Sequence, residues 1–173
     1  VLSRRQRQMC IRDSHNGEIN TFRGNKNWMK VHEQEMNSNL FENIENLKPV
    51  IQQGTSDSAA LDNVFELLNI SGQPAPLAKL MLVPDAWSKK SETLPKDHQQ
   101  LFNFLNSTME PWDGPAAIAG TDNEWVIAAN DRNGLRPLRY AITKDNLLFA
   151  GSETGMIEPV SYTHLRAHET EEN

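Results

Sequence analysis

The sequence predicts an α+β domain in which helices come first along the chain and antiparallel strands follow. Before Gly114, apolar residues recur at three- and four-residue spacing, which is typical of amphipathic helices. After it, short apolar segments alternate with turn residues, which is typical of strands. The length of 173 residues fits one domain, with no internal repeat or long low-complexity linker.

The clearest predicted helix follows the run Thr55–Ser58, which offers several N-cap side chains, and it ends at Gly72. Its apolar face has helical spacing and consists of Leu61, Val64, Phe65 and Leu68. Weaker patterns predict a helix or a helical turn at 22–34, 40–47, 76–81 and 95–109. In the last of these segments we expect one apolar face, made of Leu101, Phe102, Leu105 and Met109.

The predicted strands lie at 116–121, 124–130, 138–143 and 147–152, and short polar turns separate them. Such short links favour an antiparallel meander. Residues 15–20 are interpreted as a strand end or a tight loop, and 89–93 as a loop. The tryptophans are expected to be core or interface residues.

Composition excludes several classes of protein. The chain has 17 Lys and Arg against 23 Asp and Glu, a net charge of −6, which argues against a nucleic-acid partner held by phosphate contacts. No apolar run approaches the roughly 20 residues of a membrane span. The one cysteine, Cys10, excludes an internal disulfide and a cysteine-based metal site. We therefore expect a cytoplasmic domain without membrane, metal or nucleic-acid partners.

The two ends of the sequence differ from the interior. Residues 8–13 can be encoded by codons whose reverse complement encodes residues 160–165, a relation that a natural domain has no reason to carry. Both runs are similar to translated adapter DNA from sequencing libraries. We therefore interpret 1–14 and 160–173 as adapter-like artefact that makes few contacts with the core. Residues 15–159 are then a partial domain, an interior fragment of a longer protein.

Three motifs carry candidate chemistry. Asn16-Gly17 is either an ordinary turn or a pair of N–H donors that converge on an oxyanion, since glycine allows close backbone approach. Asp57 is a helix-start carboxylate, which caps the helix, receives a substrate ammonium, or does both. The segment 131–137 is a turn with solvated charges or a pair of arginines for carboxylates. His15 has no Ser or Cys partner for a triad and is interpreted as a packing or turn residue.

In their order, these motifs resemble the class II glutamine amidotransferase domain of glutamate synthase large subunits. The resemblance covers 15–158 and is carried by His15–Asn20, Arg23–Met29, Thr55–Ser58, Glu110–Ala116 and Asp131–Pro137. The runs Arg-Gly-Asn-Lys-Asn-Trp-Met and Glu-Pro-Trp-Asp-Gly-Pro-Ala are the more specific ones. The resemblance implies an N-terminal-nucleophile hydrolase fold, an αββα sandwich of two antiparallel sheets between helix layers, here incomplete at the N-terminus.

The same resemblance implies glutamine hydrolysis to glutamate and ammonia through a cysteinyl thioester. By match to the family's motifs, Asn16 and Gly17 form the oxyanion hole and Asp57 binds the α-ammonium of glutamine. The family's nucleophile is an N-terminal cysteine, and an upstream arginine holds the α-carboxylate. Neither is expected here, because Cys10 lies in the adapter-like run and is not cast as the nucleophile. The fragment is therefore expected to be inactive as given.

For the parent protein, the resemblance implies FMN, an iron–sulfur cluster, 2-oxoglutarate as ammonia acceptor, and a small subunit or ferredoxin as electron donor. None of these groups is expected to bind this fragment. Two alternatives stay open: a non-catalytic amino-acid-binding or scaffold domain of the same fold, and another class II amidotransferase. The sequence does not discriminate among NADPH, NADH and ferredoxin as donor.

Overall fold

The computed structural model describes residues 12–86, 94–143, 145–156 and 165–166. Over this part of the chain the α+β prediction is confirmed. The helices are α2 (Phe22–Glu35), the 3-10 turn η1 (Ile44–Leu47), α3 (Asp57–Ile70), α4 (Ala75–Leu82) and α5 (Lys96–Thr108). The strands are β1 (Arg12–Gly17), β2 (Ala116–Thr121), β3 (Val126–Asn130), β4 (Arg139–Thr143), β5 (Leu148–Gly151) and β6 (Leu165–Arg166). The predicted loop at 89–93 lies outside the described residues.

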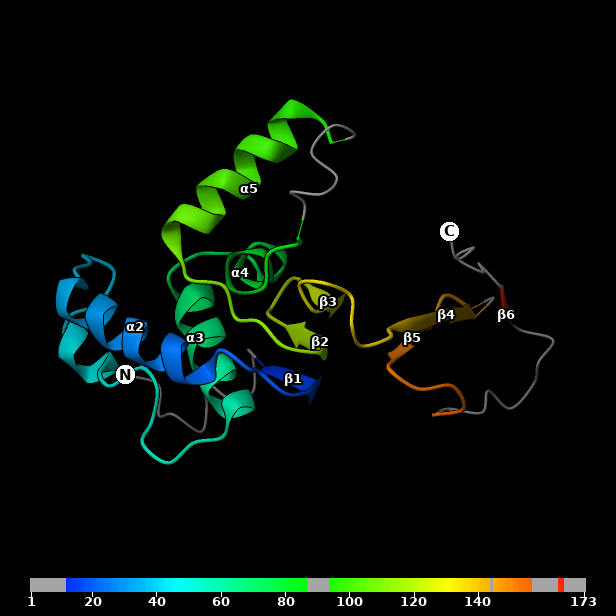
Figure 1. Cartoon of the computed structure of the whole chain (residues 1–173), viewed down its shortest axis with the longest axis horizontal. Coiled ribbons are helices and arrows are strands. Elements are labelled where there is room, and N and C mark those ends of the chain that lie inside the picture. Colours follow the sequence, from blue (N-terminus) through cyan, green and yellow to red (C-terminus); the bar gives the residue numbers. More distant parts are fainter. Residues whose placement is uncertain (1–11, 87–93, 144, 157–164, 167–173) are drawn as a thin grey trace.

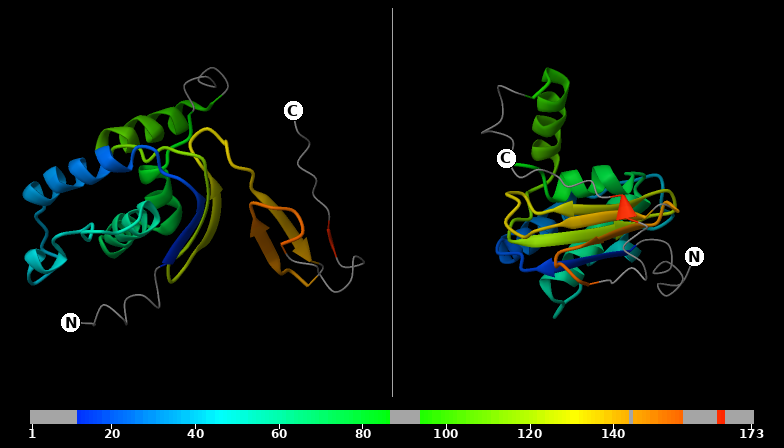
Figure 2. Two further views of the ribbon diagram at one scale, coloured as in Figure 1. Left: turned by 60° about the horizontal axis from the view of Figure 1, so that its bottom comes forward. Right: turned by 90° about the vertical axis from the view of Figure 1, so that its right-hand side faces the viewer.

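The strands form two separate three-stranded antiparallel sheets, and the predicted meander is interrupted between β3 and β4. Sheet A has the order β1-β2-β3 and sheet B the order β5-β4-β6. The helices α3 and α4 lie on one side of sheet A, and sheet B lies on its other side (Figure 1; Figure 2, left). The chain leaves sheet A after β3 because the link to β4 is folded around Asp131 instead of forming a hairpin.

The hydrophobic core lies between α3, α4 and sheet A. The side chains predicted for one face of α3 are all buried there: Leu61, Val64, Phe65 and Leu68. Ser56 is the N-cap of this helix, since its hydroxyl accepts a hydrogen bond from the Ala59 amide (3.2 Å). Ile118 of β2 and Trp112 join the same cluster.

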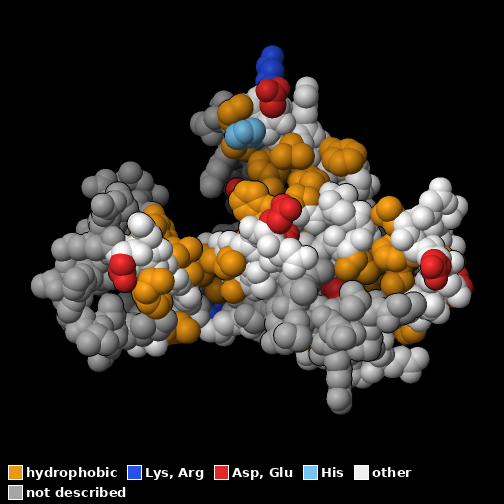
Figure 3. Space-filling view, turned by 180° about the vertical axis from the view of Figure 1, so that it is seen from behind, with side chains coloured by type: hydrophobic (Ala, Val, Ile, Leu, Met, Phe, Trp, Pro, Cys, Tyr) orange, Lys and Arg blue, Asp and Glu red, His pale blue; other side chains and the backbone are white. Residues whose placement is uncertain are grey.

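Several apolar side chains outside the core are exposed. Trp112 is in the core, whereas Trp28 and Trp125 are 53% and 50% exposed. Trp87 lies outside the described residues. On α5, Leu105 is buried but Leu101 is 40% exposed, since this helix projects from the body and packs mainly on α4 (Figures 1 and 3).

Parts of both ends pair with the interior, so the expectation that they make few contacts is wrong for these parts. β1 starts at Arg12, and its residues 12–14 pair with residues 119–121 of β2. At the other end, Leu165 and Arg166 pair with β4. The hydrogen bonds of a strand ladder are made by the backbone and do not depend on side-chain identity, so a chain of any origin can complete a sheet edge.

Candidate functional site

The end of β1 brings Asn16 and Gly17 against the start of β2, where Gly17 pairs with Ala116. A Cβ atom at Gly17 would lie only 1.8 Å from the Pro115 carbonyl oxygen, and φ is +154° there. Gly114 is the reciprocal case, because its Cβ would lie 1.9 Å from the Glu18 carbonyl oxygen. Two glycines thus allow the segments 17–18 and 114–115 to lie in direct backbone contact. Asn16 and Gly17 both remain exposed at the surface.

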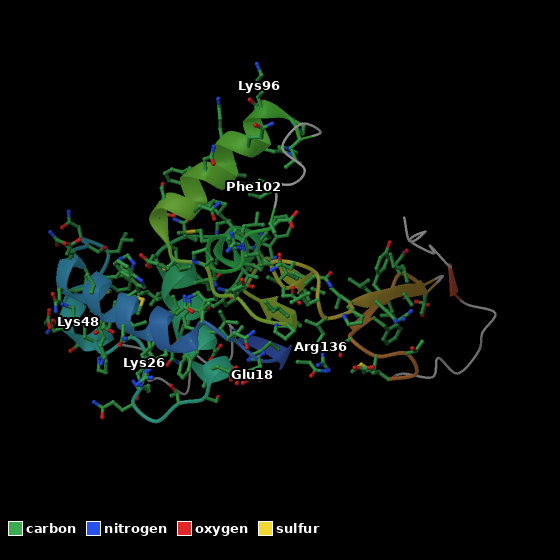
Figure 4. All side chains as sticks on the ribbon, in the orientation of Figure 1. Glu18, Lys26, Lys48, Lys96, Phe102 and Arg136 are labelled. Atoms are coloured by element: carbon green, nitrogen blue, oxygen red, sulfur yellow. The ribbon has the colours of Figure 1, made fainter. Side chains whose placement is uncertain are left out.

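The Asn16 side chain is held from the other sheet. Its Nδ2 donates a hydrogen bond to the hydroxyl of Ser152, which lies just after β5 and is 5% exposed (2.8 Å). Sequence reasoning missed this partner, because 136 residues separate the two positions and only the stacking of the sheets brings them together. Asn16 and Gly17 directly precede Glu18, which Figure 4 labels together with Arg136, on the segment that enters sheet B.

Asp57 starts α3 and points to the loop that follows Asn16 and Gly17. Its Oδ2 accepts a hydrogen bond from the Ile19 amide (2.8 Å), and its Oδ1 accepts one from the Ser58 amide (2.8 Å). Burial acts to raise the pKa of Asp57, but these amide bonds and the nearby His15 outweigh it and hold the pKa below its ordinary value. The structure therefore brings together the three residues that the sequence singles out for glutamine chemistry.

The run 110–116 contacts α2 and the residue before it, and these contacts hold the segment that lies beside Gly17. Asn25, buried in α2, donates from Nδ2 to the carbonyl oxygen of Pro111 (3.0 Å). His32 Nε2 lies 2.7 Å from Glu110 Oε2. The backbone amide of Asp113 donates to the Thr21 hydroxyl (2.9 Å). Because Gly114 and Pro115 follow directly, these contacts fix the segment against which Gly17 packs.

Asp131 organises the link between the sheets, and the expectation of solvated charges is wrong for this residue. It is 5% exposed, and its carboxylate accepts hydrogen bonds from the amides of Ala116, Asn133, Leu135 and Arg136. Burial acts to raise its pKa, and the four amides outweigh that effect and lower it. The Arg136 guanidinium pairs with the exposed Glu153 (3.3 Å), so this arginine contacts a carboxylate of the chain itself.

In the part of the chain that the structure describes, no three His, Cys, Asp or Glu side chains gather in a way that could hold a metal ion. None of the described helices has the length and apolar character needed to cross a membrane.

Comparison with known proteins gives one family. The model of the family described as "Glutamine amidotransferases class-II" matches residues 5–166, and so extends into both adapter-like ends. The chain is 55% identical over 146 residues to the glutamate synthase [NADPH] large chain of Azospirillum brasilense, covering 84% of this chain and 10% of that protein.

Further relatives carry related names. The chain is 43% identical over 145 residues to the glutamate synthase [NADPH] large chain of Bacillus subtilis, covering 83% of this chain and 10% of that one. It is 42% identical over 147 residues to the ferredoxin-dependent glutamate synthase of Pyropia yezoensis, covering 84% of this chain and 10% of the relative. The chain thus spans about a tenth of the length of these curated relatives.

Proposed function

Because this chain belongs to the class-II glutamine amidotransferase family, we propose that it is part of the glutaminase domain of a glutamate synthase. The proposed domain hydrolyses glutamine to glutamate and ammonia, and the ammonia passes to 2-oxoglutarate elsewhere in the parent protein. The observation that carries the proposal is the convergence of Asn16, Gly17 and Asp57 at the end of β1. The two stacked antiparallel sheets, with helices on one side, support the proposed αββα sandwich of an N-terminal-nucleophile hydrolase.

The register of sheet A supports an oxyanion role for Gly17. Hydrogen-bonded and non-hydrogen-bonded pairs alternate along an antiparallel ladder. The Glu18 amide donates to the Pro115 carbonyl (3.0 Å), so the neighbouring Gly17–Ala116 pair falls at a non-hydrogen-bonded position. This turns the Gly17 N–H away from β2, toward the open edge beside β1. A backbone N–H there is available to a developing oxyanion.

Asn16 supports the same role with its side chain. A primary amide has two N–H donors, and the Ser152 hydroxyl accepts one of them. The second donor is left for an oxyanion beside Gly17. Ser152 thereby fixes the rotation of the amide group, and a donor that is already oriented costs no reorganisation when charge develops.

Asp57 keeps acceptor capacity for an ammonium group. A carboxylate offers about four lone-pair sites, and two amides of this chain occupy one on each oxygen. The side chain is 24% exposed, so a ligand can reach it. Its lowered pKa keeps the carboxylate charged near neutral pH, as recognition of an α-ammonium requires.

Asp57→Ala, introduced into a full-length enzyme that carries these residues and a competent nucleophile, tests the ammonium role. Removing the partner of a bound ammonium is expected to weaken transition-state binding by about 2–5 kcal/mol. The loss appears in kcat/KM for glutamine-dependent turnover, while turnover with free ammonia is retained.

Ser56→Ala is the matched control, because it removes the N-cap of the same helix and leaves the carboxylate in place. It is expected to cost about 1 kcal/mol of stability with little effect on glutamine use. If Asp57→Ala lowers turnover with glutamine and turnover with free ammonia equally, Asp57 has only a structural role at the start of α3.

The parent protein's further partners are also proposed. FMN, an iron–sulfur cluster and an electron donor, either a small subunit or ferredoxin, belong to the proposed synthase chemistry. The described residues do not fit the iron–sulfur cluster, since no group of metal-ligating side chains occurs among them. With one cysteine in the sequence, no thiolate set for a cluster exists in this chain. We place the parent protein in the cytoplasm.

We propose further that residues 1–14 and 160–173 are adapter-derived and that the natural domain continues beyond 15–159. Reading the source genome on both sides of the codons for 15–159 tests this. We expect neither complementary run there, and we expect an upstream open frame whose mature protein starts with cysteine.

A genomic sequence that encodes residues 8–13 directly before His15 would refute the adapter origin. An upstream frame without a cysteine would favour the alternative of a non-catalytic amino-acid-binding domain.

A further inference from the structure

His15 is a buried histidine without partners. Only 3% of its side chain is exposed, and neither ring nitrogen has a hydrogen-bond partner among the described residues. Folded proteins pair nearly all buried polar groups, because an unpaired one loses its hydrogen bonds to water and gains none in return. A histidine used only for packing offers no compensation for this loss. The ring therefore needs a role in another state of the molecule.

The position of the ring indicates that role. His15 Nε2 lies 3.9 Å from Asp57 Oδ1, slightly beyond hydrogen-bond range. The two residues belong to β1 and α3, which pack against each other. Asp57 is already held by two amides, those of Ile19 and Ser58. The imidazole thus faces a carboxylate that has acceptor sites left and is open to a ligand.

We propose that His15 is a positioning residue for the amino-acid site, which closes a hydrogen bond from Nε2–H to Asp57 Oδ1 when an α-amino acid binds. This inference rests on the proposed function, because it takes Asp57 as the group that receives the ammonium. An ammonium group bound to one oxygen of Asp57 pulls the carboxylate toward itself and can rotate it. A hydrogen bond from His15 to Oδ1, added to the two amide bonds, keeps the carboxylate in its orientation. His15 does not touch the ligand and acts through Asp57.

His15 is also next to the proposed oxyanion donors, Asn16 and Gly17. His15 directly precedes Asn16, and its backbone pairs with Ile118 in the core of sheet A. A movement of under about 1 Å brings Nε2 into hydrogen-bond range of Oδ1. The histidine therefore links ammonium binding at Asp57 to the backbone that carries the oxyanion donors.

Two substitutions separate this role from packing. His15→Phe keeps a planar ring but has no N–H, and His15→Gln keeps an N–H donor at similar reach. We expect His15→Phe to weaken L-glutamine binding by the 173-residue chain about tenfold, measured by NMR titration of backbone amides. His15→Gln is expected to stay within about threefold of the unchanged chain. His98→Phe on α5, an exposed position far from the site, is the matched control and leaves binding unchanged.

A spectroscopic readout tests the hydrogen bond itself. Long-range ¹⁵N correlation spectra of the imidazoles are expected to show the His15 nitrogens shifting when L-glutamine is added. The shift is expected to disappear in Asp57→Ala. A purely structural histidine would leave its nitrogen signals unmoved by ligand. This measurement does not depend on the folding of His15→Phe.

The two possible failures are distinguishable. If the amides of Ile19 and Ser58 shift with L-glutamine while His15→Phe binds normally, the ammonium site stands and the role of His15 is wrong. If no amide of the unchanged chain responds to L-glutamine, the proposed ammonium site fails in this chain, and the role of His15 fails with it. Equal weakening by His15→Phe and His15→Gln, with equal loss of stability, assigns the residue to packing alone and refutes the proposal.

Discussion

Gly17→Ala is expected to lower the free energy of unfolding of the chain by about 2–5 kcal/mol, from backbone strain and overpacking together. The added Cβ would lie 1.8 Å from the Pro115 carbonyl oxygen, a separation that no side-chain rotation relieves, since both atoms are fixed by the backbone. The segments 17–18 and 114–115 must therefore move apart. The same movement displaces the Gly17 N–H, so ligand binding at the site falls together with stability.

Gly24→Ala is the matched control for this experiment. Gly24 lies inside α2, and a Cβ there meets nothing within 4 Å. Alanine is expected to stabilise the helix by about 0.5–1 kcal/mol. Urea unfolding of both variants measures the difference. If Gly17→Ala is no more destabilising than Gly24→Ala, the close backbone contact does not determine the geometry of the site.

A double substitution tests whether the two glycines serve one contact. Gly114→Ala alone is expected to destabilise the chain as Gly17→Ala does, because its Cβ would lie 1.9 Å from the Glu18 carbonyl oxygen. Once either substitution has separated the two segments, the second has less contact left to disrupt. The combined loss is therefore expected to be clearly smaller than the sum of the single losses. Additive losses would show that each glycine serves a separate local need.

The sequence predicts best the elements that depend only on residues close to one another in the chain. The apolar face of α3 and its N-cap within Thr55–Ser58 follow from helical spacing and cap chemistry, and both are confirmed. The division of the strands into two sheets was not predictable in this way. The turn at 122–125 keeps β2 and β3 in one sheet, while the longer link at 131–138, which also begins with Asp, separates β3 from β4. Its outcome depends on Asp131 being buried among four amides, including that of the distant Ala116.

The same distinction applies to the site and to α5. Asn16, Gly17 and Asp57 are found from motifs, and the structure brings them together. The contact of Asn16 with Ser152 and the burial of His15 arise only when the sheets and α3 pack. On α5, periodicity indicates which side chains share a face. It does not say whether anything covers that face, and Leu101 stays 40% exposed.

The 173-residue chain, expressed as written, is expected to hydrolyse no glutamine. Amide hydrolysis through a thioester needs a thiolate beside a base, and we propose that in an N-terminal-nucleophile hydrolase this base is the α-amine of the nucleophilic cysteine itself. Cys10 is the only cysteine, and nine residues precede it, so its nitrogen is part of an amide and cannot accept the proton. The oxyanion donors of Asn16 and Gly17 then have no tetrahedral intermediate to stabilise.

A glutaminase assay of the purified chain, with Cys10→Ala assayed in parallel, measures this. Without a nucleophile, an enzyme site retains at best about 10³–10⁴-fold acceleration over water, which for glutamine lies below detection in an ordinary assay. Binding and turnover are thereby separated, because Asp57 can still hold the ammonium of L-glutamine in the inactive chain. We therefore expect NMR shifts at the Ile19 and Ser58 amides without glutamate release. Release of glutamate that disappears in Cys10→Ala would show that Cys10 is the nucleophile. It would overturn both the adapter origin of residues 1–14 and the proposed requirement for a free α-amine.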